Sequence, residues 1–465
     1  MNGDIIFKKF LLLFCGLPQL IATTAFSWLY PLPFSHFLSY NDFVSCILPD
    51  PASIQPEGMS CKVTNPFEMR IKCKMRIVLF HSDTESFNYF TDQLVLEFQS
   101  RGHETFILDL RFQDQHNFEE FSSFVSTKVE LAVCFDSMCL RTEEMIRILD
   151  AWNTVVVDIL MDPPLRFHPF LEHHTKNYIL FCCDLDHVDY VKKYFGSSIA
   201  NVSFMPHAGT APNPASPIIP YSKRHYDILF SGTYYQPFNM LADMDRLMDG
   251  SPALRNFSHH VYQNLTKHSD LNIEQAVRLT LEQENWTVSE DFVKTVFGTL
   301  NHVDWAVRMY WRSEVITVLA ESGLELYLLG RGWENHPSVS YPNVHRISDR
   351  IPFEETLSAM ADAKINLNVF PWFKSGTHDR IFNSLLQHSL PLTDSSRWVD
   401  ETFTDGWDIA LYSLKNLEEL PAIAEKYLKN PDLAESVISR GHEKTIREFT
   451  WKNCVDQILS AVQTL

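Results

Sequence analysis

Short apolar runs alternate with amphipathic stretches over the first half of the chain. Apolar residues in Phe90–Gln99 and Glu143–Trp152 have helical spacing. The runs around them are apolar at nearly every position, which predicts strands of a parallel sheet covered by helices on both faces. These runs are Ile77–Phe80, Thr105–Leu108, Leu131–Phe135, Val155–Met161, Tyr178–Cys182 and Val202–Met205.

A proline-rich segment interrupts this alternation. It begins at Pro206 and runs to Pro220. A second alternation starts at Asp227–Gly232 and passes through a mostly helical stretch from Phe238 to Trp311. Further apolar runs then follow at Leu324–Leu329, Val344–Ile347, Ile365–Val369, Leu390–Thr393 and Ile409–Tyr412. We interpret the proline-rich segment as a hinge between two domains.

The predicted fold class is α/β, with two Rossmann-like domains facing across a cleft. Residues 1–74 form an N-terminal extension and linker, 75–207 the first domain, and 450–465 a closing helix that packs back on the first domain. The second domain is 208–449, with a helical insertion at about 238–311. Because ligands of open α/β sheets bind beyond the carboxyl ends of the strands, we expect functional residues directly after strands.

The segment Lys364–Gln387 carries the clearest chemistry. It predicts a buried strand, a loop holding Lys374 and Gly376, and a helix that starts near Thr377, with Thr377 as its N-cap. The helix is amphipathic, and its polar face includes Arg380. Two cations, Lys374 and Arg380, beside an exposed helix N-terminus suit a diphosphate. The alternative is an ordinary strand–helix unit with a solvated polar face.

Charge and composition narrow the class of partner. The 465 residues are 45% hydrophobic and 21% charged, as in soluble globular proteins. A protein that binds nucleic acid requires a basic surface, so a formal net charge of −19 argues against a nucleic-acid partner. This net charge still permits a local basic pocket.

The cysteines predict no metal site. Of the nine, Cys134 and Cys139 have four residues between them, and Cys182 and Cys183 are adjacent. Neither pair has a second pair or well-spaced histidines that would complete a zinc site. We expect free thiols, no metal and no tightly bound cofactor.

The N-terminus departs from the pattern of a soluble chain. Lys8 and Lys9 precede a stretch from Phe10 to Tyr30 without a charged residue. This stretch is interpreted as a signal peptide or an anchor helix. Alternatively, it results from the choice of start codon, because Met75 begins the first core strand and would be a natural start. We expect a cytoplasmic protein, with peripheral or N-terminal membrane association left open.

Several motifs of the second half resemble those of glycosyltransferases with the GT-B architecture, and especially the bacterial family 1-like group related to spore-maturation protein CgeB. The resemblance covers most of residues 224–463. It rests on segments that occur in the same order and spacing: Asp227–Thr233, Tyr327–Trp333, Ala363–Asn368, Gly376–Phe382, Leu392–Asp394 and Phe449–Trp451.

The resemblance implies a sugar-nucleotide site in the second domain. Gly232 and Thr233 would approach the phosphates, and Gly330, Arg331 and Gly332 would border the nucleotide. His378 and Arg380 would face the diphosphate, beside the loop residues Lys374 and Gly376 of the strand–loop–helix unit described above.

Two positions depart from the family pattern. Asn383 stands where a glutamate usually binds the ribose, and His388 stands where glycine is common. An amide can still pair with ribose hydroxyls, but it loses the stronger, charge-assisted hydrogen bond.

The first domain would bind the acceptor. His81 follows the first apolar run and Asp162 the fourth, so either is a candidate general base. The alternative for Asp162 is a turn residue before two prolines. His207, in the proline-rich segment, is interpreted as a hinge residue rather than a general base.

Together these features predict an enzyme that moves a sugar from a nucleotide-diphosphate donor to an acceptor hydroxyl on a glycan, lipid or protein. Two other functions stay open. One is a sugar-nucleotide epimerase or an inactive GT-B protein, and the other is an exported two-domain ligand-binding protein.

Overall fold

The computed structural model describes residues 74–111, 115–212 and 217–465. Lys74–Leu465 forms one compact unit. The expected N-terminal extension, apart from Lys74, lies outside the described residues.

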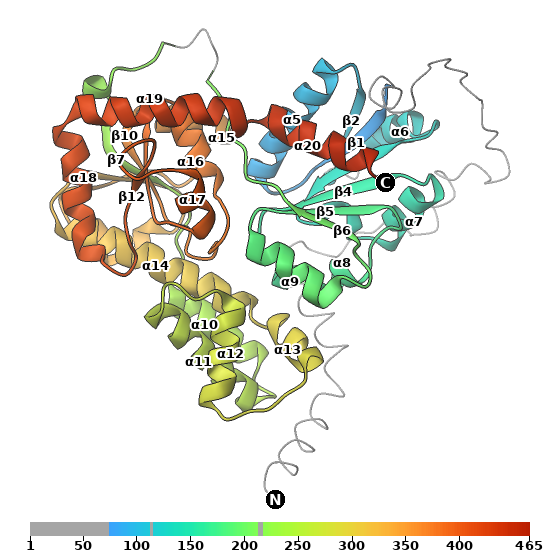
Figure 1. Cartoon of the computed structure of the whole chain (residues 1–465), viewed down its shortest axis with the longest axis horizontal. Helices are drawn as coiled ribbons and strands as arrows, with labels where there is room; N and C mark the ends of the chain where they lie inside the picture. The colour runs from blue at the N-terminus through green and yellow to red at the C-terminus, as the bar shows by residue number, and fades with distance from the viewer. Residues whose placement is uncertain (1–73, 112–114, 213–216) are drawn as a thin grey trace, which may run out of the picture. The chain divides into compact units, whose positions relative to one another are not determined.

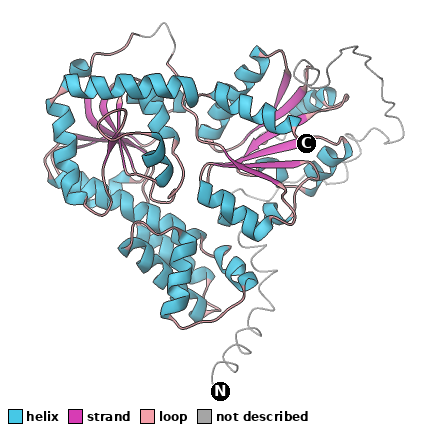
Figure 2. Cartoon of the chain, in the orientation of Figure 1, coloured by secondary structure: helices cyan, strands magenta, loops and turns pink. Residues whose placement is uncertain are grey.

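The first parallel sheet takes its strands from residues 76–204. Within the described residues it has six strands in the order β2-β1-β3-β4-β5-β6 (Figures 1 and 2). Val78 on β1 pairs with Phe106 on β2 and Ala132 on β3. The strands are β1 (Arg76–His81), β2 (Glu104–Asp109), β3 (Leu131–Phe135), β4 (Val155–Leu160), β5 (Tyr178–Cys182) and β6 (Asn201–Phe204). The helices are α5 (Glu85–Ser100), α6 (Gln115–Phe124), α7 (Glu143–Ala151), α8 (His168–Glu172) and α9 (Leu185–Phe195).

A second parallel sheet, also of six strands in the described part of the chain, has the order β12-β11-β10-β7-β8-β9. The strands are β7 (Tyr226–Ser231), β8 (Leu326–Leu329), β9 (Val344–Ser348), β10 (Ala363–Asn368), β11 (Leu390–Thr393) and β12 (Ala410–Leu411). The accompanying helices are α15 (Phe353–Ala361), α16 (Asp379–Leu386), α17 (Arg397–Thr402), α18 (Leu420–Lys429) and α19 (Pro431–Glu448). The expected α/β class with two parallel sheets is confirmed.

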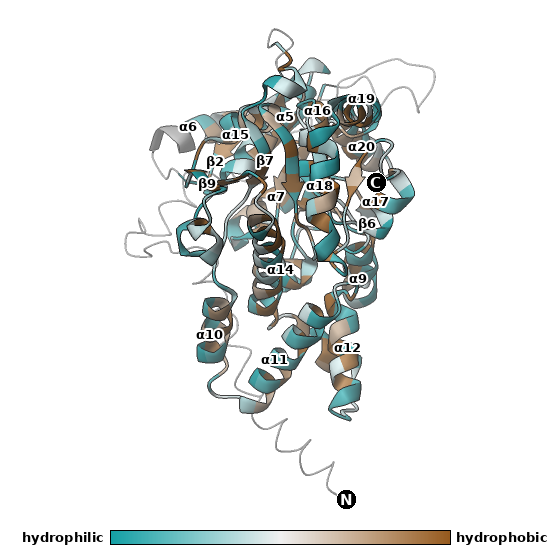
Figure 3. Ribbon diagram, turned by 90° about the vertical axis from the view of Figure 1, so that its left-hand side faces the viewer, coloured by the Kyte–Doolittle hydropathy of each residue, from teal (hydrophilic) through white to brown (hydrophobic). Residues whose placement is uncertain are grey.

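Five helices follow β7 before the second sheet resumes. They are α10 (Pro237–Leu247), α11 (Pro252–Lys267), α12 (Ile273–Gln283), α13 (Glu290–Phe297) and α14 (Asn301–Glu321). Helices α10 and α11 pack against α14. Figure 3 shows both polar and apolar stretches on α11 and α12, as expected of helices that bury one side. Helix α14 extends ten residues beyond the expected end at Trp311.

The chain ends on helix α20 (Trp451–Gln463), which packs on α5 of the first sheet. Arg101 forms an ion pair with Asp456, and the Gln457 amide donates to the Phe204 carbonyl at 2.7 Å. The last helix of the chain therefore contacts a helix that covers the first sheet.

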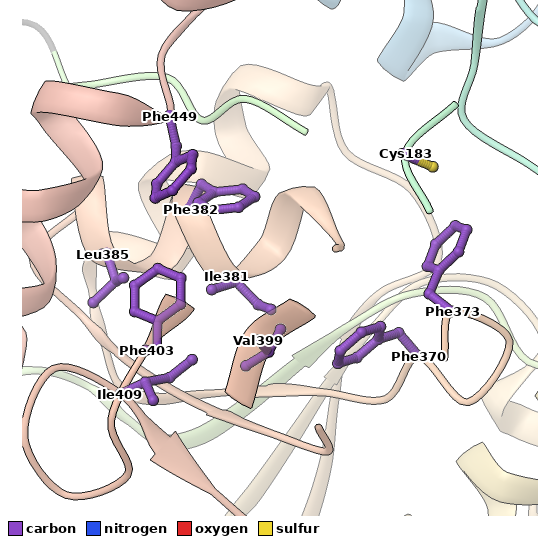
Figure 4. Packing of buried hydrophobic residues seen from close by; sticks show 10 residues of the cluster. All are labelled: Cys183, Phe370, Phe373, Ile381, Phe382, Leu385, Val399, Phe403, Ile409 and Phe449. Atoms are coloured by element: carbon purple, nitrogen blue, oxygen red, sulfur yellow. The ribbon is translucent and has the colours of Figure 1, made fainter. Parts of the chain in front are cut away.

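A buried apolar cluster fixes the loop after β10 and helix α16. Phe370 and Phe373 from the loop and Ile381, Phe382 and Leu385 from the helix belong to it (Figure 4). All five side chains are buried, and their close packing holds the backbone of this loop and helix, and therefore its polar groups, in place.

Candidate active site

The second sheet has a topological switch point between β7 and β10. Read from β9, its order is β9-β8-β7-β10-β11-β12, which is the doubly wound Rossmann order. Ligands bind beyond the strand ends at such a point. Gly232 follows β7 and Val369–His378 follows β10, so these two loops flank the expected ligand position.

Close backbone packing explains the glycines of the β7 and β8 loops. Gly330 and Gly332 have φ of 137° and 85°, and a Cβ on either would overlap the backbone of residues 232–234. The Trp333 indole donates to the Gly232 carbonyl at 2.7 Å. A Cβ on Gly232 itself would lie 3.0 Å from Nη2 of Arg380. The glycines therefore hold the Gly232 turn directly against this guanidinium.

Arg380 lies at the start of α16, beneath the Gly232 turn. Its Nη1 is 3.3 Å from Asn368 Oδ1 and 3.3 Å from His378 Nε2. Burial lowers the pKa of the guanidinium, and the neighbouring Asp379 charge opposes that shift. Arginine nevertheless stays charged in proteins, so the site holds a partly buried cation.

Arg312 is a site residue that the sequence analysis missed. It lies on α14, is 6% exposed, and donates to the Thr233 carbonyl at 2.7 Å. Burial and the charges of Arg380 and Arg308 lower its pKa well below the ordinary value. Within the described residues, neither Arg312 nor Arg380 is hydrogen-bonded to a carboxylate.

The spacing of charged residues along α14 could have indicated Arg312 from the sequence. Asp304, Arg308 and Arg312 recur every four residues on a helix whose other inward positions are apolar. Charges at this spacing share one helix face. A charged row inside an apolar pattern is expensive unless it is paired or binds a ligand.

Asp162 is held in a buried ion-pair cluster. Its two carboxylate oxygens accept from Arg166 at 2.8 Å and from Arg308 at 2.9 Å, and Asp304 pairs with both arginines. Burial opposes ionisation of Asp162, but the charges of Arg166 and Arg308 prevail and lower its pKa to about 2. A carboxylate with so low a pKa is a weak base. The expected general-base role of Asp162 is therefore not supported, and the side chain instead orients Arg308.

His378, not Thr377, is the N-cap of α16, which begins at Asp379. The His378 Nδ1 lies 2.8 Å from Asp379 Oδ1, while burial and the charge of Arg380 lower the pKa of His378 to about 4. The expected N-cap, Thr377, instead contacts His207, with its Oγ1 2.8 Å from Nδ1 of that ring.

The rings of His207 and His378 stack at 5.8 Å with an angle of 17°. Burial and His378 lower the pKa of His207 to about 3. Both imidazoles are therefore neutral at neutral pH, and they join the hinge to the candidate site. The hinge interpretation of His207 fits this contact.

Lys374 points away from Arg380. Its ammonium donates to the Ser269 carbonyl at 2.5 Å, and it lines a cavity of about 50 Å³ with His187 and Trp372. Burial lowers the pKa of Lys374 to about 8. Gly376 packs on the backbone of Cys183 and Asp184, so its missing Cβ serves contact with the first sheet. The structure thus does not bring these two residues to the Arg312–Arg380 pair.

Asn383 is also occupied by the protein. Its Oδ1 accepts from the Thr210 backbone at 2.9 Å, its Nδ2 donates to Asp379 at 3.2 Å, and the residue is 1% exposed. This placement contradicts a free ribose-binding amide. His388 has φ of 57°, which explains why glycine is common in this place, and its ring stacks on His442 at 4.0 Å.

The remaining expected site residues are Arg331 and His81. The Arg331 side chain is exposed, and its carbonyl accepts from the Tyr234 backbone at 2.9 Å. His81 ends β1, and its Nε2 lies 2.9 Å from Asp92 Oδ1. It lies at the carboxyl edge of the first sheet, where an acceptor is expected.

Two searches concern metals and membranes. Among residues 74–111, 115–212 and 217–465, no group of three or more His, Cys, Asp or Glu side chains is arranged to hold a metal ion. No helix among these residues is long and apolar enough to cross a membrane.

Residues 312–460 match the protein-family model described as "Glycosyl transferase-like". This part of the chain is a glycosyltransferase-like domain. It includes Arg312, the loop after β10 and helix α16. The expected glycosyltransferase is confirmed at the level of this domain. A search of curated proteins found no match.

Solved structures with a similar chain course include three glycosyltransferase-related proteins. A glycosyltransferase from Rickettsia africae and a sucrose-phosphate synthase from Thermosynechococcus elongatus are each 9% identical, with a TM-score of 0.48. Each match covers 84% of this chain and 99% of the other. Anabaena HepE, in complex with UDP and glucose, is 9% identical over 84% of this chain and 100% of its own, with a TM-score of 0.46.

Proposed function

We propose that the glycosyltransferase-like domain binds a nucleoside-diphosphate sugar and that the chain transfers the sugar to an acceptor hydroxyl. The observation that carries the proposal is the pair Arg312 and Arg380. Arg312 is buried and Arg380 is partly buried at the Gly232 turn, and neither has a carboxylate hydrogen-bond partner among the described residues. Buried charges are normally paired, so a bound dianion would complete this site.

The chemistry of the leaving group fits the same pair. Transfer breaks the bond between the sugar and the diphosphate, and negative charge develops on the diphosphate. Preorganised cations in a site shielded from water stabilise such charge strongly. In this proposal the two arginines supply that stabilisation and no metal ion is required.

The turn residues would position the donor. Gly232 and Thr233 would lie beside the phosphates, and Arg331 and Gly332 would border the nucleoside, as the family resemblance implies. His378 would act through Arg380, which it contacts. Lys374, Gly376 and Asn383 would support the loop and the hinge rather than touch the donor, because their contacts are to protein groups.

The finer family relation and the location of the protein are also proposals. The motif order supports a place near the bacterial group related to CgeB. A cytoplasmic location with membrane attachment is proposed, and the uncharged stretch Phe10–Tyr30 supports the attachment. Fractionation of the full chain beside a chain that starts at Met75 tests the attachment, because equal distribution of the two would exclude it.

A thermal-shift screen tests donor binding. UDP, GDP and ADP are compared with the matching monophosphates. We expect one diphosphate to raise the Tm of the wild type but not that of Arg380→Ala. Arg447→Ala, which removes an exposed arginine paired with Glu448, is the control and should respond like the wild type. No response of the wild type to any diphosphate would refute the proposal. Binding without turnover would favour an inactive GT-B protein.

A further inference from the structure

Two consecutive residues after β3 have left-handed backbone conformations. Asp136 has φ of 47° and Ser137 has φ of 56°. Both are buried, and neither is glycine. Side chains other than glycine rarely adopt this region, and such strained positions concentrate at functional sites. The pair therefore marks the end of β3 as a place to look for function.

A buried carboxylate forces this conformation. Asp158 accepts from the Ser137 backbone at 2.9 Å and from its hydroxyl at 2.7 Å. The Tyr178 hydroxyl donates to the same carboxylate at 2.7 Å. Three hydrogen bonds to one fully buried group hold the turn, and with it the direction of the Asp136 side chain.

The turn lies at the switch point of the first sheet. The order β2-β1-β3 places the carboxyl ends of β1 and β3 side by side while their connections leave in opposite directions. This is where a doubly wound sheet binds its ligand. Because we expect the first domain to bind the acceptor, Asp136 stands at the sheet edge where an acceptor hydroxyl would arrive.

The same edge of the sheet connects with the proposed diphosphate site. Asp162, at the end of β4, bonds to Arg308, whose guanidinium carbon lies 4.1 Å above the Trp372 ring. The Arg312 guanidinium carbon lies 5.3 Å from the same ring. A short chain of contacts therefore joins the end of the first sheet to the arginine pair.

Asp136 and Asp162 are carboxylates with opposite environments. Asp162 is paired with two arginines, which holds its pKa at about 2. Asp136 Oδ1 accepts the Met161 backbone N–H at 2.8 Å, and among the described residues no lysine or arginine forms an ion pair with Asp136. Burial, and then the Asp162 charge, raise its pKa well above the ordinary value. Once ionised, Asp136 is therefore the stronger base of the two, whereas Asp162 stays a fixed anion.

We propose that Asp136 is the general base that takes the proton from the acceptor hydroxyl. The proposal rests on the proposed function. The acceptor O–H proton passes to the Asp136 carboxylate while the oxygen forms a bond to the anomeric carbon. The bond from that carbon to the diphosphate breaks, and its electron pair stays on the leaving diphosphate beside Arg312 and Arg380. A single displacement of this kind inverts the anomeric configuration.

Asp136→Asn separates basicity from structure. Asparagine tolerates the left-handed conformation, and its Oδ1 keeps the bond from Met161. The charged and titratable neighbours, Asp158, Asp162, Arg166 and Cys183, are left in place. Because the pKa of Asp136 is raised in the folded state, ionising it costs stability as pH rises. The variant should therefore be at least as stable as the wild type at pH 8, and this difference in stability should disappear only as the pH falls to about 4, the ordinary pKa of an aspartate.

The experiment uses the full chain, a panel of UDP-, GDP- and ADP-hexoses, and methanol as acceptor, since a methyl hexoside keeps its anomeric configuration. We expect the wild type to form the methyl hexoside of inverted configuration. Asp136→Asn should bind the diphosphate unchanged but lose about 100-fold or more in turnover, the lower range for a lost general base. Glu143→Gln, which removes an exposed carboxylate on α7, is the control and should keep full turnover.

Three results would overturn the assignment: a retained anomeric configuration, an Asp136→Asn variant with more than a tenth of wild-type turnover, or a wild type that binds a hexose donor without methanolysis. Failure to bind any nucleoside diphosphate would instead refute the proposed function. The two failures are therefore distinguishable.

Discussion

Arg312 on α14 and Arg380 on α16 reach the same backbone turn from two different helices. Arg312 donates to the Thr233 carbonyl at 2.7 Å, and Arg380 Nη2 lies 3.0 Å from where a Cβ of Gly232 would stand. The two guanidiniums carry like charges and do not neutralise each other. The charge of Arg380 contributes to the lowered pKa of Arg312. Two like charges held together in this way predict an anion as their partner.

Replacement of Arg312 tests its share of that site. Arg312→Ala should weaken diphosphate binding by about 10- to 100-fold, the range for a hydrogen bond to a charged group. Arg312→Lys keeps the charge but loses the planar, bidentate hydrogen-bond geometry of the guanidinium. Its affinity for the diphosphate should therefore lie between those of the wild type and Arg312→Ala. Isothermal titration calorimetry measures both variants. Unchanged affinity in Arg312→Ala would remove this residue from the site.

Gly232→Ala should block the turn without unfolding the protein. The added methyl group would meet the Arg380 guanidinium at 3.0 Å and the Phe230 ring at 3.1 Å, and it would displace the guanidinium from the diphosphate. We expect loss of the ligand-induced Tm shift with little change in circular dichroism. Gly250→Ala, where a Cβ meets open space, is the matched control. A normal Tm shift in Gly232→Ala would contradict close approach of a ligand to this turn.

Asp162→Asn should destabilise the fold, because it removes one of the two carboxylates that Arg166 and Arg308 share and leaves Asp304 to pair with both. The expected loss is about 3–5 kcal/mol in the free energy of unfolding, the usual range for one broken buried ion pair. Denaturant unfolding at pH 7 measures it.

The pH dependence of Asp162 has a definite sign. Its folded pKa of about 2 lies below the unfolded value of about 4. The stabilisation is therefore present above pH 4 and is lost as pH falls toward 2. The difference between wild type and Asp162→Asn should shrink between pH 4 and 2. A difference that stays constant over this range would contradict the ion-pair account.

His388→Gly should relieve backbone strain after α16. Glycine adopts the left-handed conformation freely, which removes a conformational free-energy cost of about 1–2 kcal/mol. The substitution also removes the ring stacking on His442, which opposes this gain. Burial, with His442 and Arg224, lowers the pKa of His388 to about 4, so protonation opposes folding as pH falls below about 6.5. The gain in Tm should therefore be larger at pH 5 than at pH 8. A variant less stable than the wild type at pH 5 would contradict this balance.

The architecture was predictable because buried parallel strands are apolar at nearly every position. Runs such as Leu131–Phe135 coincide with a strand, and the pattern of Trp451–Val462 marks a helix that ends one residue later. The switch point between β7 and β10 also follows from the order of strands and helices. Arg380 was found because it lies in a strand–loop–helix unit that is continuous in sequence.

Partners from distant segments could not be predicted. Asn383 faces the hinge because Thr210 packs on α16, and Lys374 faces Ser269 because the helical insertion folds back on the loop. Arg312 lies far from Arg380 in sequence, and only the folded structure brings α14 to the Gly232 turn. The pKa of Asp162 depends on Arg308 in the same way. Sequence periodicity gives the face of a helix but not what that face meets.

Calorimetric titration of UDP and GDP, each beside its monophosphate, into wild-type protein and Arg380→Ala tests the central claim most directly. The account predicts that the wild type binds one diphosphate at least about tenfold more tightly than its monophosphate, which corresponds to about 1.4 kcal/mol. It also predicts that this preference disappears in Arg380→Ala. Equal binding of diphosphate and monophosphate by the wild type, or a preference that survives the loss of Arg380, would contradict it.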